Sequence, residues 1–121
     1  MKKVRVVIWN EFVHEREEGA AGDYIRTVYP AGIHACLAEK LAAADLEIRT
    51  ATLDEPGQGL PEPVLDETDV LVWWGHCAHD RVDDSLVDRV QQRILAGMGL
   101  VVLHSGPVSY THLRAHETDQ Y

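Results

Sequence analysis

The segment DVLVWWGHCAHD, residues 69–80, predicts the fold of this chain more directly than any other. Residues 70–74 form a short apolar run, rich in β-branched and aromatic side chains, between an aspartate and a glycine. Such an uninterrupted run is typical of a strand covered on both faces, as in a parallel sheet with helices on either side. We therefore expect a buried parallel strand here, with the polar residues 75–80 following its carboxyl end.

Three other segments have strand character. Residues 4–9 (VRVVIW) are almost continuously apolar, residues 46–53 (LEIRTATL) alternate as an edge strand does, and residues 100–103 (LVVL) form a short fourth run. Residues 10–29 are polar and contain glycine, which indicates a loop after the first strand.

Helices are predicted between these strands. Pro30 is expected at the first position of a helix whose apolar residues recur every four positions up to Leu41. A short helical turn is expected over residues 64–68, and Asp83 or Asp84 is expected to cap a longer helix. The alternation predicts one α/β domain of three layers with a mainly parallel sheet, which is flavodoxin-like if the third strand pairs with the first.

Polar residues follow the predicted strands or begin the helix after the first strand. Because ligands of open α/β sheets bind at the carboxyl ends of the strands, these residues are expected to converge on one crevice. They are Asn10, Glu11, His34, His76, His79, Asp80, His104 and Ser105.

The histidines in this group predict a metal site. Neutral imidazole is a ligand for zinc and similar divalent ions, which take three or four protein ligands. The predicted ligands are His34, His76, His79 and His104. Glu11 or Asp80 is expected to be the catalytic carboxylate that orients a histidine or moves a proton. Asn10, Trp74 and Ser105 are the predicted substrate-binding residues, and Trp74 could stack on a sugar ring.

Structural roles compete with these assignments. A histidine at a strand end is more often a hydrogen-bonded structural residue than a ligand, and the spacing of His76 and His79 falls short of an H-E-x-x-H pattern. Trp73 and Trp74 point to opposite faces of their strand, so at least one of them is expected in the core. The LHSGP segment around Ser105 lacks the G-x-S-x-G spacing of a nucleophile elbow, which argues against an α/β-hydrolase.

Composition limits the partners. The chain has 11 basic and 20 acidic residues and a net charge of -9, which argues against binding to nucleic acid or to an anionic membrane. No apolar run has the length needed to cross a bilayer. Cys36 and Cys77 allow one disulfide at most and form no C-x-x-C motif, so a reduced, cytoplasmic setting is expected.

Five segments, in this order and at these spacings, carry a family resemblance: VVIWNEFVHE, YPAGIHACLAEKL, IRTATLDEPGQGL, LDETDVLVWWGHCAHDRV and GMGLVVLHSG. Together they resemble the N-terminal part of the trehalose utilisation (ThuA-like) family, from Val4 to Gly106. The resemblance implies a class I glutamine amidotransferase-like fold, a flavodoxin-like α/β sandwich. The cysteine nucleophile of glutamine amidotransferases is absent, because His104 and Ser105 occupy its place, so amidotransferase chemistry is not expected.

The resemblance also implies a function in bacterial sugar catabolism. It implies a cytoplasmic protein that acts on trehalose or a related disaccharide, or on a keto derivative, together with an oxidoreductase partner. The oligomeric state is left open, a homo-oligomer included. Under this resemblance the same four histidines become metal or substrate ligands, with Asn10 and Glu11 as further pocket residues. A non-catalytic sugar-binding or regulatory domain, or an inactive fragment, is the alternative.

The end of the chain departs from the family pattern. After LHSG the family continues with another histidine and a phenylalanine-serine pair, whereas this chain reads PVSYTHLRAHETDQY. We expect residues 1–107 to be the N-terminal part of a ThuA-like domain and residues 108–121 to be translated sequencing-adapter read-through. His112 and His116 are therefore not assigned to the metal site, and the domain is expected to be truncated.

Overall fold

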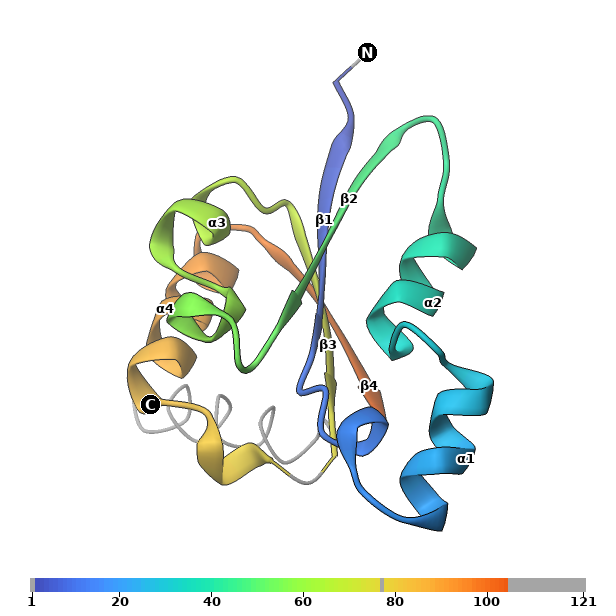
Figure 1. Ribbon diagram of the computed structural model, residues 1–121. Coiled ribbons are helices and arrows are strands. Elements are labelled where there is room, and N and C mark those ends of the chain that lie inside the picture. Colours follow the sequence, from blue (N-terminus) through green and yellow to red (C-terminus); the bar gives the residue numbers. More distant parts are fainter. Residues whose placement is uncertain (1, 77, 105–121) are drawn as a thin grey trace.

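A parallel four-stranded sheet forms the centre of the molecule (Figure 1). The computed structural model describes residues 2–76 and 78–104, without the side chains of His79 and His104. The sheet order is β2-β1-β3-β4. The strands are β1 (Val4–Asn10), β2 (Leu46–Thr52), β3 (Val70–Gly75) and β4 (Gly99–His104). The predicted pairing of the first and third strands is confirmed, and with it the flavodoxin-like α/β class.

Helices cover both faces of the sheet, as Figure 1 shows. One face carries α1 (Ala20–Val28) and α2 (Ile33–Leu41), and the other carries α3 (Glu62–Asp66) and α4 (Asp84–Leu95). Three short 3₁₀ helices lie in the connections: η1 (His14–Arg16), η2 (Pro56–Gly59) and η3 (His79–Arg81). No helix in the described part of the chain is long and apolar enough to cross a membrane.

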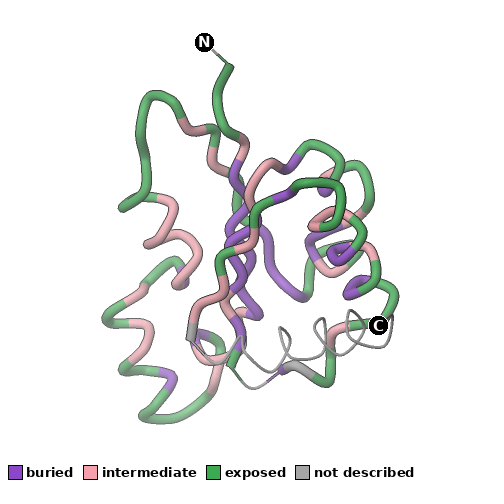
Figure 2. The backbone as a smooth tube through the Cα atoms, turned by 180° about the vertical axis from the view of Figure 1, so that it is seen from behind, coloured by how far each residue is buried: buried purple, intermediate pink, exposed green. Residues whose placement is uncertain are grey.

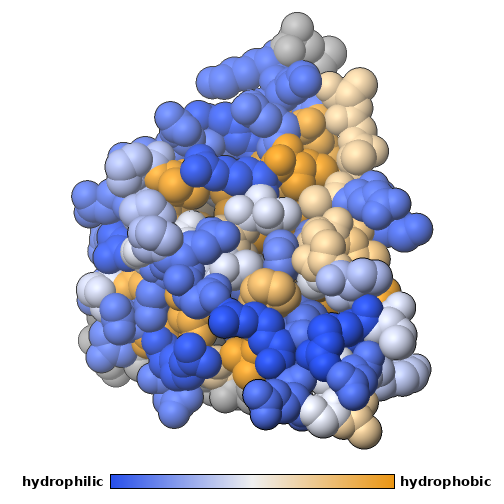
Figure 3. Space-filling model, viewed as in Figure 1, coloured by the Kyte–Doolittle hydropathy of each residue, from blue (hydrophilic) through white to orange (hydrophobic). Residues whose placement is uncertain are grey.

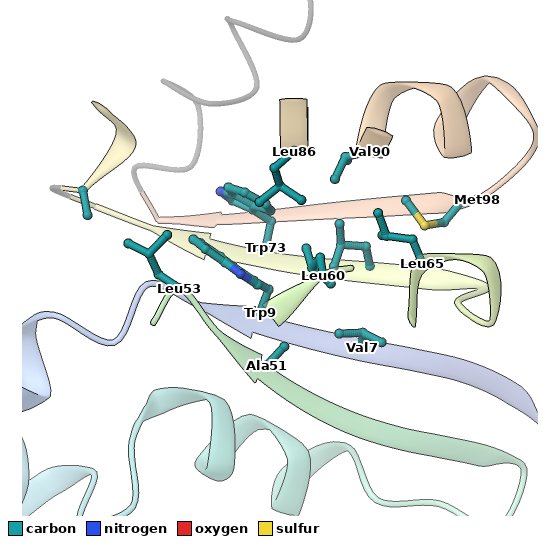
Figure 4. Packing of buried hydrophobic residues seen from close by; sticks show 12 residues of the cluster. Val7, Trp9, Ala51, Leu53, Leu60, Leu65, Trp73, Leu86, Val90 and Met98 are labelled. Atoms are coloured by element: carbon teal, nitrogen blue, oxygen red, sulfur yellow. The ribbon is translucent and has the colours of Figure 1, made fainter. Parts of the chain in front are cut away.

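The two faces of β1 serve two separate apolar clusters, because alternate side chains of a strand point in opposite directions. Val7 and Trp9 face α3 and α4, where the Trp9 ring stacks on Trp73 with centroids 4.0 Å apart (Figure 4). Val6 and Ile8 face the other side and pack with residues of α2. The expectation that one of the two tryptophans of β3 belongs to the core is confirmed, since Trp73 is buried.

Burial is uneven between the two helical layers. Figure 2 shows buried residues concentrated in the sheet and in the α3 and α4 layer, whereas α2 has none among its nine residues. The side of the molecule seen in Figure 3 has a mostly hydrophilic surface, with apolar residues between the polar ones. The α1 and α2 layer is therefore held to the rest by fewer apolar contacts and relies more on hydrogen bonds.

The predicted loop after the first strand is wrong in part, because α1 and η1 lie within it. Gly19 precedes α1, and Gly22 lies within its first turn and lowers its intrinsic helix propensity, so tertiary contacts override the local preference. The predicted role of Pro30 is also wrong. Pro30 lies in the turn between the helices, and α2 begins at Ile33 after Gly32, whose φ of 99° suits glycine. The helices at 64–68 and after Asp83 are confirmed within two residues.

Candidate functional site

The carboxyl ends of β1 and β3 lie side by side, because the two strands pair in parallel in the sheet. Asn10 is the register partner of Trp74, and the backbone N–H of Glu11 donates to the Trp74 carbonyl at 3.3 Å. Glu11 therefore leaves β1 at the point where His76 leaves β3. Polar side chains on two strands that are far apart in the sequence are brought to one edge by this pairing.

Three potential metal ligands meet at this edge: Glu11, His14 and His76. One ligand atom of each lies within 4.8 Å of the others. Glu11 is buried, His14 on η1 is half-buried, and His76 is exposed. His14 Nε2 and His76 Nδ1 are in contact. The three side chains thus form a group that opens to solvent on one side and is closed by the protein on the other.

Neighbouring groups hold two of these side chains in place. His14 Nδ1 lies 3.2 Å from Glu17 Oε1, which leaves Nε2 of the same ring directed at His76. Glu11 Oε2 accepts a hydrogen bond from the backbone N–H of Ala78 at 2.9 Å. A carboxylate on the second ring nitrogen of a histidine is the usual way in which proteins fix the tautomer and orientation of a metal ligand.

The donor set suits a divalent metal ion. Two imidazoles and one carboxylate are the protein ligands of many catalytic zinc sites and of non-haem iron(II) sites, both of which keep positions open for substrate. The buried Glu11 carboxylate, which accepts the Ala78 N–H, and the His14 imidazole, which contacts the Glu17 carboxylate, agree with that use. Glu11, His14 and His76 therefore lie close enough together, and have the right chemistry, to hold a metal ion.

A second polar network lies under the loop that carries His14. Asn10 and Glu15 are both buried, and Asn10 Nδ2 donates to Glu15 Oε2 at 2.6 Å. The same carboxylate oxygen accepts the N–H of Ile33 at 2.9 Å, at the first residue of α2. A carboxylate at the N-terminus of a helix is favoured by the helix dipole. Glu15 therefore ties η1 to both β1 and α2.

His34 belongs to this second network. The metal-ligand cluster found among the described residues consists of Glu11, His14 and His76 and does not include His34. Its Nδ1 lies 3.1 Å from Asn10 Nδ2, and its ring contacts Phe12 edge to face. Burial lowers the pKa of His34, while the nearby Glu15 carboxylate opposes that change. His34 thus packs as a largely neutral, partly buried side chain beside the loop.

Helix α1 secures the same loop from outside. Arg26 Nη1 donates to the backbone carbonyls of Glu15 and Glu17 at 3.0 and 2.8 Å. Gly22 makes this close approach feasible, because a Cβ atom at that position would lie 1.9 Å from the Glu17 carbonyl oxygen. The helix that sequence reasoning missed is therefore part of the frame that positions His14.

The structure places the remaining predicted residues as follows. Asp80 is exposed on η3, and Trp74 is half-buried with its ring 6.0 Å from that of His14. Ser105, and the side chains of His79 and His104, lie outside the described part of the chain, as does the predicted boundary at residue 107. His14 was not predicted as a ligand. The usable signal was Glu17, three residues after His14, but it carries meaning only if the segment is helical and not a loop.

A family model described as trehalose utilisation (ThuA) matches residues 5–118, nearly the whole chain. The chain belongs to the ThuA family. No curated protein matches it closely. Membership of the ThuA family agrees with the flavodoxin-like fold described above and indicates a role in trehalose utilisation.

Proposed function

We propose that this ThuA-family chain binds a divalent metal ion, zinc being the first choice, through Glu11, His14 and His76, and acts there on a trehalose-related sugar or keto-sugar. The observation that carries the proposal is the convergence of these three side chains within 4.8 Å, with Glu17 on the second nitrogen of His14. The match to the trehalose utilisation family supports a trehalose-related sugar as the substrate.

Each residue has a separate task in this proposal. A divalent ion, when bound, supplies a Lewis acid that polarises a carbonyl or hydroxyl oxygen of the sugar. Glu17 orients His14, and the Ala78 N–H orients Glu11. Glu11 was expected to be a catalytic base, but its place in the cluster suits a ligand better. Asp80, exposed on η3, remains the carboxylate that we assign to proton transfer.

The partner, the cellular location and the source of the protein are part of the same proposal. A keto-sugar substrate must be made by oxidation of a sugar hydroxyl, so an oxidoreductase is the expected partner. The net charge of -9 argues against nucleic acid and anionic membrane as partners. Two cysteines without a C-x-x-C motif support a reduced, cytoplasmic location. The family resemblance supports a bacterial source.

Turnover with and without metal tests the proposal. The full chain is loaded with zinc or stripped with EDTA and incubated with trehalose, or with trehalose oxidised to a keto-sugar, while NMR follows the sugar. We expect conversion of one of these sugars only in the zinc-loaded sample, and a rate at least roughly 10-fold lower for His76→Ala. Conversion that EDTA and His76→Ala leave unchanged would refute the metal-dependent function.

A non-catalytic sugar-binding role is the second candidate. The half-buried Trp74, beside the two imidazoles, offers a surface that could stack on a sugar ring. Sugar binding without conversion in either sample, and with an affinity independent of zinc, would favour this role.

A further inference from the structure

A pocket of about 320 Å³ opens next to the Glu11 cluster and uses Glu11 as part of its wall. Phe12 and Arg16 from the segment after β1, Asp54 after β2 and Arg81 on η3 contribute to its lining. The pocket therefore spans the carboxyl ends of neighbouring parallel strands, where α/β sheets bind ligands. Its volume is within the range of small-molecule sites, at the small end.

Most charged groups of this pocket are already engaged. Asp54 accepts the hydroxyl of Thr52 at 2.8 Å and pairs with Arg16, which together lower the pKa of Asp54. Glu17 pairs with His14. Both carboxylates are therefore held in fixed positions.

Arg81 is the exception. Its backbone N–H donates to the Ala78 carbonyl at 3.0 Å, and its carbonyl accepts the side-chain amide of Gln58 at 2.8 Å. Its guanidinium makes no hydrogen bond or ion pair with the residues that the structure describes. A guanidinium has five N–H donors, so Arg81 brings unused donors to the pocket on an anchored backbone.

Phe12 lines the pocket in a strained conformation. Its φ of 56° is in the left-handed region, which is unfavourable for a bulky side chain and is common at binding sites. The buried Asn10 holds this conformation, because its Oδ1 accepts the Phe12 N–H at 3.0 Å. The chain thus keeps an aromatic side chain at a position where glycine would be less strained.

We propose that this pocket seats a ring of the sugar. The guanidinium of Arg81 donates hydrogen bonds to the sugar's hydroxyl and ring oxygens, and Phe12 packs against its C–H groups. An adjoining ring or carbonyl then reaches the Glu11 cluster across their shared wall. This inference rests on the proposed function for the identity of the ligand, and it assigns the sugar to the Arg81 side of the cluster and not to the Trp74 side.

Calorimetric titration with trehalose tests the assignment on the zinc-loaded full chain. Arg81→Ala is expected to weaken trehalose binding roughly 10-fold or more, because several donors are lost. Phe12→Gly is expected to weaken it at least severalfold while relieving the backbone. Arg49→Ala, an exposed arginine of β2 outside this pocket, is the control and should bind as the wild type does. Zinc affinity should change less than about twofold in all three, since none removes a ligand.

The outcomes separate this inference from the proposed function. Three results would each overturn the pocket assignment. The first is undiminished trehalose binding by both Arg81→Ala and Phe12→Gly, and the second is loss of binding in Trp74→Ala alone. The third is no binding by the wild type at millimolar trehalose. Failure of the wild type to bind zinc would instead refute the proposed metal site, and loss of trehalose binding in Arg81→Ala would still support the pocket.

Discussion

His14 is held by Glu17: its Nδ1 lies 3.2 Å from Glu17 Oε1, and the backbone N–H of Glu17 donates to the His14 carbonyl at 3.3 Å. The tight turn of η1 thus closes on itself through both backbone and side chain. Because Nδ1 is engaged, Nε2 is the nitrogen presented to the cluster. The imidazole is therefore oriented before any ligand arrives, which reduces the entropy lost on binding.

Removing this contact should weaken metal binding without unfolding the chain. Glu17→Gln is expected to lower zinc affinity about 10-fold, because a carboxylate partner raises the basicity of the ligating imidazole and fixes its orientation. Zinc titration against a competing chromophoric chelator measures the change. Glu18→Gln, at the exposed neighbouring residue, is the matched control and should leave the affinity unchanged. Equal affinities for the wild type and Glu17→Gln would contradict the assigned role.

Glu15 should matter for stability. Glu15→Ala removes the acceptor of Asn10 Nδ2 and of the Ile33 N–H from a buried position, and is expected to cost about 2–4 kcal/mol of unfolding free energy. Urea denaturation followed by tryptophan fluorescence measures it. Glu18→Ala serves as the control, because Glu18 is exposed and makes no such contact with the described part of the chain. A change below about 0.5 kcal/mol would show that Glu15 does not anchor the loop.

Gly22→Ala separates helix propensity from close packing. Alanine in a helix interior normally stabilises by about 1 kcal/mol relative to glycine. Here the new Cβ would meet the Glu17 carbonyl oxygen at 1.9 Å, so α1 must move away from η1. We expect a net loss of stability and weaker zinc binding in the same titrations. A variant more stable than the wild type would show that α1 does not pack in this way.

Acid stability should depend on the ion pair between Arg5, near the start of β1, and Asp69, which immediately precedes β3. Hydrogen bonds from Arg5 lower the pKa of Asp69 from 3.8 to about 2. Since the folded-state pKa is depressed, the stabilisation is complete above the unfolded value near 3.8 and is lost as pH falls through about 2.

The variant Asp69→Asn lacks this titration. Its urea midpoint should be lower than that of the wild type at pH 5, and the difference should shrink as the pH is lowered toward 2. A difference that stays constant between pH 5 and 2 would be inconsistent with an ionised, paired Asp69.

The sheet could be predicted from the sequence because its strands are apolar enough to be recognised locally. Residues 70–74 and 4–9 show this, and their pairing follows from the parallel α/β pattern. The helix at 20–28 could not be predicted in the same way. Gly22 within it and Gly19 just before it are residue types common in loops, and the contacts that stabilise it, such as Arg26 with the carbonyls of Glu15 and Glu17, join residues that are not neighbours in the sequence.

The sequence predicted where the candidate site lies, at the carboxyl ends of the strands, but only some of the residues that form it. His76 was predicted as a ligand and Glu11 as a catalytic carboxylate, both because they follow strands, whereas His14 lies on a 3₁₀ turn inside the predicted loop. His34 was grouped with the ligands because α2 begins at the same edge. In the structure its Nδ1 faces Asn10. This orientation is set by tertiary packing, which cannot be read from the spacing of residues in the sequence.

The most direct test of the central claim is zinc stoichiometry by equilibrium dialysis with elemental analysis, for the full chain and for His14→Ala, His76→Ala and His34→Ala. We predict one tightly bound zinc in the wild type and in His34→Ala, and loss of affinity by roughly 100-fold or more in the other two variants. No bound zinc in the wild type, or loss in His34→Ala with retention in His14→Ala, would contradict the assignment of Glu11, His14 and His76 as the metal site.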